Sequence, residues 1–348
     1  MIDIPLLDRL ADLRRENPKL RARDAALALG VSEAELVAAG GVGAARRLGG
    51  DWGELVKALP TIGRIMCLTR NEHCVHERYG RFEDVSVNGL MGLVLGPDID
   101  LRIFFSHWKS GFAVADRGPH GDRLSLQIFD GHGVAVHKIY STEGTDMAAF
   151  EALIGRFHDV GPFGPLELAP APAAAAARPD AQIDVDGFVA AWAGMKDTHE
   201  FFPLLRRFGL QRLQAMRLAG PRFATEVGAE AVEKAFAAAA AQALPIMVFV
   251  GSRGVIQIHT GPVVNLKAMG PWFNVLDPEF NLHLRADRVA SAWVTRKPTE
   301  DGVVTALELF DAEGETIALI FGARKPGKPE LAAWRDLAES LVPADRAA

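Results

Sequence analysis

The spacing of hydrophobic positions divides the chain into helical and strand-like stretches. Near the start, apolar residues recur three or four positions apart, as they do on one face of a helix. Further on, short apolar-rich runs are separated by Gly, Asp and Asn, which is typical of antiparallel hairpins. The helices predicted in the first half are 2–17, 22–29, 33–39, 51–59 and 145–157, and the predicted strands lie between 62 and 140.

The same order of elements begins again after a segment rich in Pro and Ala. The helices predicted in the second half are 186–195, 202–208, 226–243 and 329–341, and the predicted strands lie between 246 and 321. In neither half do helices alternate with strands, so the βαβ units of a parallel sheet are not expected. The pattern therefore predicts the α+β class.

The order of elements recurs because the sequence itself is repeated. The stretch 94–140 aligns without a gap with the stretch 275–321, and Leu101 matches Leu282 at an offset of 181 residues. A period of that length indicates two domain-sized halves and not a solenoid. We therefore expect an internal duplication of two similar halves, each a large antiparallel β-sheet flanked by helices.

Composition suggests where the halves meet. Pro and Ala dominate the segment between them, as in a semi-rigid linker. We expect an N-terminal repeat over 1–166, a Pro/Ala-rich linker over 167–182 and a C-terminal repeat over 183–348. A chain of 348 residues is long enough for two such domains.

Composition and charge narrow the possible functions. Hydrophobic residues make up 49% of the chain and charged residues 24%, as in ordinary globular proteins. The net charge of −6 disfavours a general nucleic-acid surface. The only cysteines, Cys67 and Cys74, have a spacing that fits neither a zinc knuckle nor a disulfide framework. No apolar run approaches the roughly 20 residues of a membrane helix, and the first residues lack a secretory pattern, so we expect a cytoplasmic protein.

The motifs of the common enzyme classes are absent. The chain has no GxGxxG after a strand, no Walker A loop, no GxSxG elbow, no HExxH and no CxxC pair. His73 and His76 are spaced so that both could bind one metal ion, but such a site needs two further ligands, and the sequence does not identify that pair. Chemistry must therefore come from single histidines and from basic residues on the predicted strands.

His199 is the residue that we single out as a metal ligand. Asp197 and Glu200 have the spacing of a capping box around it, and near a helix N-terminus the neutral imidazole is favoured. The neutral imidazole is also the form that binds metals. Pro203 allows a different arrangement, in which the helix starts later and His199 lies in the preceding turn. A hydrogen-bonded surface or core histidine remains the alternative to a ligand.

Four basic residues are further candidates. Arg102 stands among apolar residues of a predicted strand, so it needs either a carboxylate partner or an anionic ligand. Each of the other three can reach an acidic ligand or can simply be a solvated charge. These three are Arg212, Lys297 and Arg324.

Several long strings in the chain have an unusual composition. They include LTRNE at 68–72, IDLRIFFSHWK at 99–109, VHKIY at 136–140, HEFF at 199–202, PWFNVLDP at 271–278 and RKPT at 296–299. These strings resemble the cytoplasmic haem-utilisation proteins of the HemS/HmuS/ChuS family. The resemblance covers nearly the whole chain, and it implies two similar halves with haem held between a sheet and helices.

The same resemblance implies the residues that would hold haem b. The histidine just ahead of a helix would coordinate the iron, an arginine on a strand would face the opposite side of the haem, and other basic residues would hold the propionates and surrounding groups. In the same order, these residues are His199, then Arg102, then Arg212, Lys297 and Arg324, with Phe249 as a further contact. Where relatives tend to carry Gln and Tyr on the last strand, this chain has Leu319 and Phe321, so two polar contacts would be missing.

The resemblance implies a cytoplasmic haem-binding protein that receives imported haem and delivers, stores or helps degrade it. It suggests a haem-uptake ABC transporter and a downstream haem oxygenase as partners, and it leaves a homodimer open. The alternative is an enzyme that opens the porphyrin with a reductant and O2, with Arg102 acting on the distal side. A DNA-binding or regulatory role is weaker, and it rests on a helix-turn-helix-like pattern over 23–32.

Overall fold

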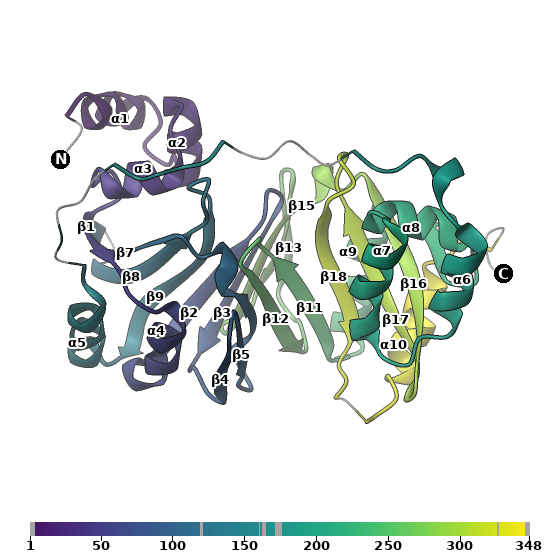
Figure 1. Ribbon diagram of the computed structural model, residues 1–348. Helices are drawn as coiled ribbons and strands as arrows, with labels where there is room; N and C mark the ends of the chain where they lie inside the picture. The colour runs from purple at the N-terminus through teal and green to yellow at the C-terminus, as the bar shows by residue number, and fades with distance from the viewer. Residues whose placement is uncertain are drawn as a thin grey trace. The chain divides into compact units, whose positions relative to one another are not determined.

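The computed structural model describes residues 4–118, 121–159, 161, 165–170, 176–325 and 327–344. Its contacts divide the chain into two compact units (Figure 1). Unit 1 consists of Met1–Arg70, Glu77–Pro172 and Gly251–Gln257, and unit 2 consists of Asn71–His76, Ala173–Val250 and Ile258–Ala348. Each unit thus contains a short segment from the other half of the sequence.

The boundaries that the sequence suggested for the repeats stay a prediction. They assign every residue before 167 to one half and every residue after 182 to the other. Of the predicted linker 167–182, residues 171–175 lie outside the described residues.

The first half confirms the predicted order of helices, hairpins and a closing helix. Its helices are α1 (Ile4–Glu16), α2 (Ala22–Leu29), α3 (Glu33–Ala38), α4 (Trp52–Ala58) and α5 (Met147–Phe157), with 3₁₀ turns η1 (Leu59–Ile62) and η2 (Phe105–His107). Its strands are β1 (Ala44–Leu48), β2 (Gly63–Arg70), β3 (Cys74–Gly80), β4 (Val85–Asn88), β5 (Met91–Leu95), β6 (Asp100–Phe104), β7 (Ser110–Gly118), β8 (Gly121–Phe129) and β9 (Ala135–Thr145). A capping box formed by Ser32 and Glu35 starts α3.

The second half repeats this order. Its helices are α6 (Val185–Ala193), α7 (Phe201–Phe208), α8 (Arg212–Ala219), α9 (Ala231–Ala241) and α10 (Ala332–Ser340), with 3₁₀ turns η3 (Asp180–Gln182), η4 (Thr198–Glu200) and η5 (Ala286–Arg288). Its strands are β10 (Ala224–Val227), β11 (Ile246–Gly251), β12 (Val255–Gly261), β13 (Leu266–Met269), β14 (Trp272–Leu276), β15 (Phe280–Arg285), β16 (Ser291–Thr299), β17 (Gly302–Phe310) and β18 (Thr316–Gly322).

Four elements differ from the sequence-based expectation. The strands β1 and β10 and the helix α8 were not predicted, and the helix expected over 226–243 begins only with α9, because β10 occupies its first residues. Both strands are short, and their pairing partners β7 and β16 lie far along the chain, so the local pattern carries little signal. Helix α8 has only eight residues between Gly209 and Gly220, both with positive φ.

The strands form two antiparallel sheets of nine strands each, which confirms the predicted α+β class. The strand orders are β1-β7-β8-β9-β2-β3-β15-β14-β13 and β10-β16-β17-β18-β11-β12-β6-β5-β4. Each strand of the second order is the repeat counterpart of the strand at the same place in the first. The duplication that the sequence predicted therefore extends to strand order.

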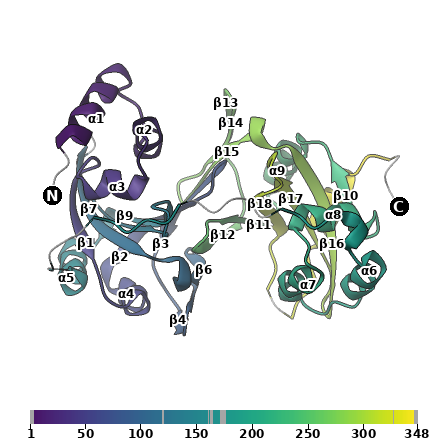
Figure 2. The ribbon, with the colours of Figure 1, turned by 45° about the horizontal axis from the view of Figure 1, so that its top comes forward.

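In unit 2, helices cover both faces of the sheet strands (Figure 2). Helices α6, α7 and α8 pack on one face, where Trp293 and Phe310 join the same core as Trp192. Helices α9 and α10 pack on the other face, where Leu307 joins the same core as Trp334. Alternate residues of β16 and β17 therefore point into two different cores.

Each unit is completed by a hairpin tip from the other half of the sequence. In unit 2, the Asn71 side chain donates to the carbonyl of Ile317 at 2.7 Å. In unit 1, Ser252 lies 181 residues further along, and its hydroxyl donates to the carbonyl of Val136, also at 2.7 Å. Both side chains accept from the backbone N–H groups two and three residues onward. The two tips are thus equivalent under the repeat.

Candidate functional site

A partly exposed apolar wall lies on the sheet face of unit 2 that α6, α7 and α8 cover. Phe249 on β11 pairs in register with Leu319 on β18, and its ring contacts that of Phe321, with centroids 5.0 Å apart. Leu319 pairs with Glu308, which pairs with Trp293, and Trp293 belongs to the core beneath α6, α7 and α8. The wall residues therefore lie on the helix-covered face. All three wall residues are partly exposed, so a ligand can contact this apolar part of the face.

His199 lies in the 3₁₀ turn η4, directly ahead of α7. The carboxylate of Asp197 accepts the backbone N–H of His199 at 2.8 Å and lies 2.7 Å from Nδ1 of the ring. The hydrogen bond from this backbone N–H is the largest influence on the pKa of Asp197, and it lowers that pKa. The imidazole side chain is 85% exposed. Because Nδ1 is engaged by the carboxylate, Nε2 is the nitrogen that a ligand can reach.

The capping box predicted around His199 does not form. Glu200 accepts from the backbone N–H of Lys196 at 3.3 Å, and the reciprocal bonds of Asp197 and Glu200 are not made. Asp197 instead caps the short 3₁₀ turn through His199. Helix α7 begins at Phe201, so His199 lies in the turn before the helix, as the presence of Pro203 had allowed.

A buried charge cluster lies on the same sheet face. Glu308 on β17 is fully buried; it accepts from Arg212 Nε at 2.7 Å, from Thr295 Oγ1 at 2.9 Å and from Lys297 Nζ. Burial raises the pKa of Glu308, but the charges of Arg212 and Lys297 outweigh burial and hold the pKa well below its usual range. Both cations also lie against the ring of Phe201, at 5.1 and 4.7 Å from its centroid. The cluster holds two positive charges and one negative charge.

Glu308 is the site residue that sequence reasoning missed. A signal was present, because Glu308 is the one charged residue in the otherwise apolar run from Val303 to Phe310. A charge in such a strand requires a partner. Its partner Arg212 is 96 residues away in the sequence, so only the fold identifies the pair.

Arg324 follows β18, and its side chain includes a buried donor that has no hydrogen-bond partner among the described residues. Its terminal nitrogen donates to Asp301 at 3.2 Å, while its Nε is buried and makes no hydrogen bond within the described part of the chain. The charge of Arg324 is also among the influences that lower the pKa of Asp197, the partner of His199. Arg324 therefore acts electrostatically on the turn that carries His199.

Arg102 is the only predicted site residue that lies in unit 1. It stands on β6, where it forms an ion pair with Asp100 and donates to the carbonyl of Leu101 at 3.3 Å. Burial raises the pKa of Asp100, and the charge of Arg102 opposes that shift. Of the two partners that the sequence allowed for Arg102, a carboxylate or an anionic ligand, the structure shows the carboxylate. The other five predicted site residues belong to unit 2.

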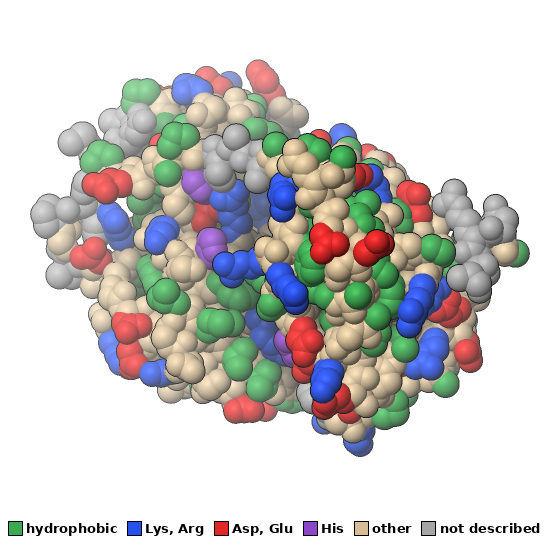
Figure 3. Space-filling model, turned by 45° about the vertical axis from the view of Figure 1, so that its right-hand side comes forward, with side chains coloured by type: hydrophobic (Ala, Val, Ile, Leu, Met, Phe, Trp, Pro, Cys, Tyr) green, Lys and Arg blue, Asp and Glu red, His purple; other side chains and the backbone are tan. Residues whose placement is uncertain are grey.

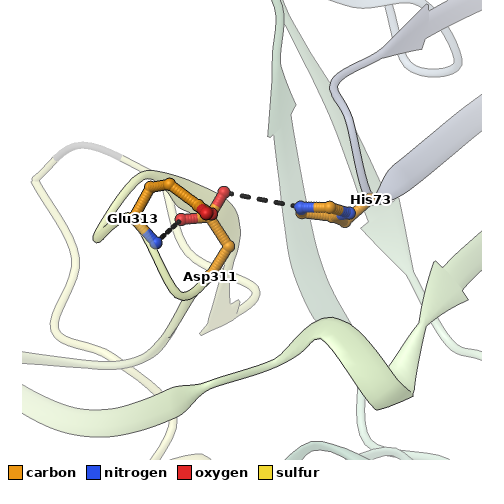
Figure 4. Close-up of side chains that lie close together, drawn as sticks. All are labelled: His73, Asp311 and Glu313. Carbon is orange, nitrogen blue, oxygen red and sulfur yellow. Dashed lines mark hydrogen bonds and ion pairs between the residues drawn. The ribbon is translucent and has the colours of Figure 1, made fainter. Parts of the chain in front are cut away.

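The two histidines predicted as a metal-binding pair have separate surroundings. His76 is buried against Phe280, with ring centroids 4.9 Å apart. His73 Nε2 lies 3.5 Å from a carboxylate oxygen of Asp311, and Glu313 completes the group (Figure 4). A metal-ligating group that holds both histidines is not found in the described ranges.

Two stretches of the chain, 30–157 and 209–341, match the family model described as the haemin-degrading HemS.ChuX domain. The chain belongs to this family. One match falls in each half, in agreement with the internal repeat. His199 lies between the two matched stretches, whereas the other five predicted site residues lie within them.

Curated relatives in this family match along nearly their whole length. The hemin transport protein HemS of Yersinia enterocolitica is 42% identical over 325 residues, which are 93% of each chain. The hemin transport protein HmuS of Yersinia pestis is 40% identical over 348 residues, which are 99% of each chain.

Solved structures of family members share the fold. Holo-PhuS, a heme-binding protein from Pseudomonas aeruginosa, is 52% identical with a TM-score of 0.94 and covers 97% of this chain and 98% of its own. ChuS, a heme degrading enzyme from Escherichia coli O157:H7, is 40% identical with a TM-score of 0.91 and covers 97% of this chain and 99% of its own. The HemS/HmuS/ChuS resemblance drawn from the sequence is thereby confirmed.

Proposed function

We propose that the chain binds haem b on the helix-covered sheet face of unit 2, with His199 as the iron ligand. The observation that carries this proposal is the Asp197–His199 pair, which engages Nδ1 and leaves Nε2 exposed. Histidines that bind metals commonly donate their other N–H to a carboxylate in this way. The names of the family and its relatives, which refer to haemin degradation, hemin transport and heme binding, point to the ligand.

Other residues of unit 2 fit the chemistry of haem, a flat apolar ring with two carboxylates. The wall of Phe249, Leu319 and Phe321 offers the apolar contact. The cluster of Arg212, Lys297 and Glu308 has one positive charge in excess, which a propionate can balance. On the face drawn in Figure 3, hydrophobic side chains (green) lie exposed among basic ones (blue).

The two remaining arginines complete the proposed site. The buried Nε of Arg324 lacks a partner among the described residues, and an oxygen of the ligand can accept from it. We assign Arg102 to the side of the iron opposite His199, where a guanidinium can orient a water or bound oxygen by hydrogen bonds. Bound haem would supply the redox chemistry of its iron, while Leu319 and Phe321 add no polar group to this side.

A hemin titration of the purified chain tests the iron ligand. The wild-type protein should give a saturable, one-to-one change in the Soret band. His199→Ala should change the bound spectrum and weaken binding by at least about tenfold, because the iron loses its protein ligand. His107→Ala is the matched control, since His107 is also an exposed histidine in a 3₁₀ turn. An unchanged spectrum and affinity in His199→Ala would refute the ligand assignment.

The second candidate function is haem degradation with a reductant and O2. It is favoured by the likeness to ChuS, which is described as a heme degrading enzyme and as a heme oxygenase. A reductant should then convert the bound haem to a linear tetrapyrrole even with catalase present. Arg102→Ala should slow that decay and leave the one-to-one titration intact. A Soret band that persists under these conditions favours transport or storage.

We further propose that the protein works in the cytoplasm, receives haem from an uptake ABC transporter and passes it to a downstream haem oxygenase. Both cysteines are free and buried, as expected in a reducing compartment. None of the described helices is both long and apolar enough to cross a membrane. Size-exclusion chromatography with and without hemin tests for a homodimer. A DNA-binding role is the weaker alternative, because acidic side chains lie among the basic ones on the face in Figure 3.

A further inference from the structure

A second group of ligand-type side chains lies in unit 2, formed by His73, Asp311 and Glu313 (Figure 4). Each offers one nitrogen or oxygen atom, and these three atoms lie within 4.8 Å of one another. None of the three is among the residues assigned to haem. The group joins the hairpin tip of the first half to a turn of the second half.

The backbone of His73 is held on both sides. Its N–H donates to the Asn71 side chain at 3.1 Å, and its carbonyl accepts from the N–H of Arg285 at 2.8 Å. The imidazole side chain is only 17% exposed, and Nε2 faces Asp311 at 3.5 Å. The hairpin tip therefore fixes the position of the imidazole ring, which is largely shielded from solvent.

The carboxylate of Asp311 is oriented by its own turn. One oxygen accepts the backbone N–H groups of Glu313 at 3.1 Å and Glu315 at 2.8 Å. The other oxygen is thereby turned toward His73. Glu313 is exposed, so its side chain can adjust to a bound ion. A fixed imidazole, a fixed carboxylate and an adaptable carboxylate thus converge.

A pocket adjoins the group and leaves room for further ligands. Its volume is about 360 Å³, enough for several water molecules. It is lined by Glu72, His73, Asp287, Arg288, Ala290, Ala312 and Glu313. Asp287 in this lining is paired with Arg285, but Glu72 and Glu313 still outnumber Arg288, so the lining favours a cation over an anion.

We propose that His73, Asp311 and Glu313 bind one divalent first-row transition-metal ion, with water filling the remaining positions. Imidazole favours such ions over Ca²⁺ and Mg²⁺, which prefer all-oxygen sites. Atoms bound to one ion at roughly 2.0–2.2 Å lie about 3 to 3.5 Å apart. The separation of His73 and Asp311 meets this requirement, and a side-chain rotation of Glu313 brings in the third ligand.

The site is confined to one copy of the repeat. At an offset of 181 residues, Asp311 corresponds to Asp130, but His73 corresponds to Gly254, which has no ligand atom. Within the described ranges, no second group of this kind occurs. Glu313 corresponds to His132, so the equivalent place in unit 1 keeps a carboxylate and one imidazole but lacks the ligand that His73 supplies.

A calorimetric titration of the full-length, haem-free chain with Zn²⁺ tests the proposal. At an ionic strength of about 0.15 M, where diffuse attraction between exposed charges is screened, we expect one equivalent to bind. His73→Ala and Glu313→Gln should each weaken binding by at least about tenfold. Glu315→Gln is the matched control, because it removes a charge from the same turn and keeps the backbone N–H that Asp311 uses. It should bind Zn²⁺ as the wild type does.

Three results would overturn the metal site. They are the absence of saturable binding, unchanged affinity in His73→Ala, and an equal loss in Glu315→Gln, which would indicate only a diffuse acidic surface. Circular dichroism of each variant checks folding; Asp311 is left unchanged because its side chain holds the turn. The same variants should keep the wild-type hemin titration, so failure of the metal site is distinguishable from failure of the haem site.

Discussion

Burial decides how individual histidines behave in this chain. His137 on β9 is fully buried, with Nδ1 2.9 Å from the Thr69 hydroxyl, and burial lowers its pKa to about 3. His199 has the opposite surroundings, since its ring is exposed and paired with Asp197. A buried imidazole of this kind stays neutral and serves the core, whereas the exposed one can take part in ligand chemistry.

His137 should make the stability of the protein depend on pH. An unfolded histidine titrates near pH 6.5. Below that pH, His137 is protonated in the unfolded chain but stays neutral in the folded protein. Acid therefore favours unfolding. The free energy of unfolding should fall by at most about 1.4 kcal/mol per pH unit until the pH reaches about 3.

The variant His137→Gln removes this titration and keeps a polar side chain beside Thr69. Urea denaturation between about pH 6.5 and 4.5 should show a weaker pH dependence than in the wild type, by about one proton. The control His107→Gln changes an exposed histidine and should keep the wild-type dependence. Equal slopes for wild type and His137→Gln would show that His137 does not carry the effect.

At the scale of elements, one buried carboxylate joins two strands and a helix. Glu308 on β17 pairs with Lys297 on β16 and with Arg212 at the start of α8. Removing one partner from a buried ionic cluster leaves charge without compensation. Glu308→Gln should therefore lower the free energy of unfolding by about 3–5 kcal/mol in urea denaturation.

Glu230 offers the comparison for this prediction. It forms an exposed ion pair with Lys234 at the start of α9, so Glu230→Gln should leave the urea midpoint unchanged. If Glu308→Gln were equally harmless, Arg212 and Lys297 would not depend on that carboxylate. The haem site would then have to be built without a fixed pair of cations.

Local patterns predicted most elements and part of the site. Apolar spacing identified nine of the helices, and the unusual strings led to His199 and to the basic residues. The rest depends on partners that are distant in the sequence. The edge strand β10 exists through its pairing with β16, and Arg212 meets Glu308 only in the fold. Such pairs cannot be predicted from residues that are close together in the sequence.

At the scale of the whole molecule, the duplication does not divide the chain at its linker. Residues 71–76 belong to unit 2, and residues 251–257 belong to unit 1. The repeat predicted two halves but not this exchange, because a hairpin tip has the same local sequence pattern whichever unit it completes. The exchange also brings His73 to Asp311, which no local pattern could suggest.

The exchanged tips allow a test in which one copy of the repeat serves as the template for the other. Asn71 fixes its tip by donating to the Ile317 carbonyl and by accepting two backbone N–H groups. Ser252 makes the same three contacts at the equivalent place, with Val136 as the carbonyl partner. A serine hydroxyl is therefore sufficient for this role in the shared backbone geometry.

Asn71→Ala should lower the free energy of unfolding by about 1–3 kcal/mol, because the Ile317 carbonyl and two backbone N–H groups lose their partner. Asn71→Ser should recover most of that loss, since the repeat uses serine for the same contacts at Ser252. Urea denaturation of the three proteins, with hemin absent, measures both effects. Equal stability of the Ala and Ser variants would mean that the tips are held by backbone pairing alone. Rescue by serine would instead show that these side chains hold each hairpin tip in place. Each tip would then be held in the unit that is built mainly from the other half of the sequence.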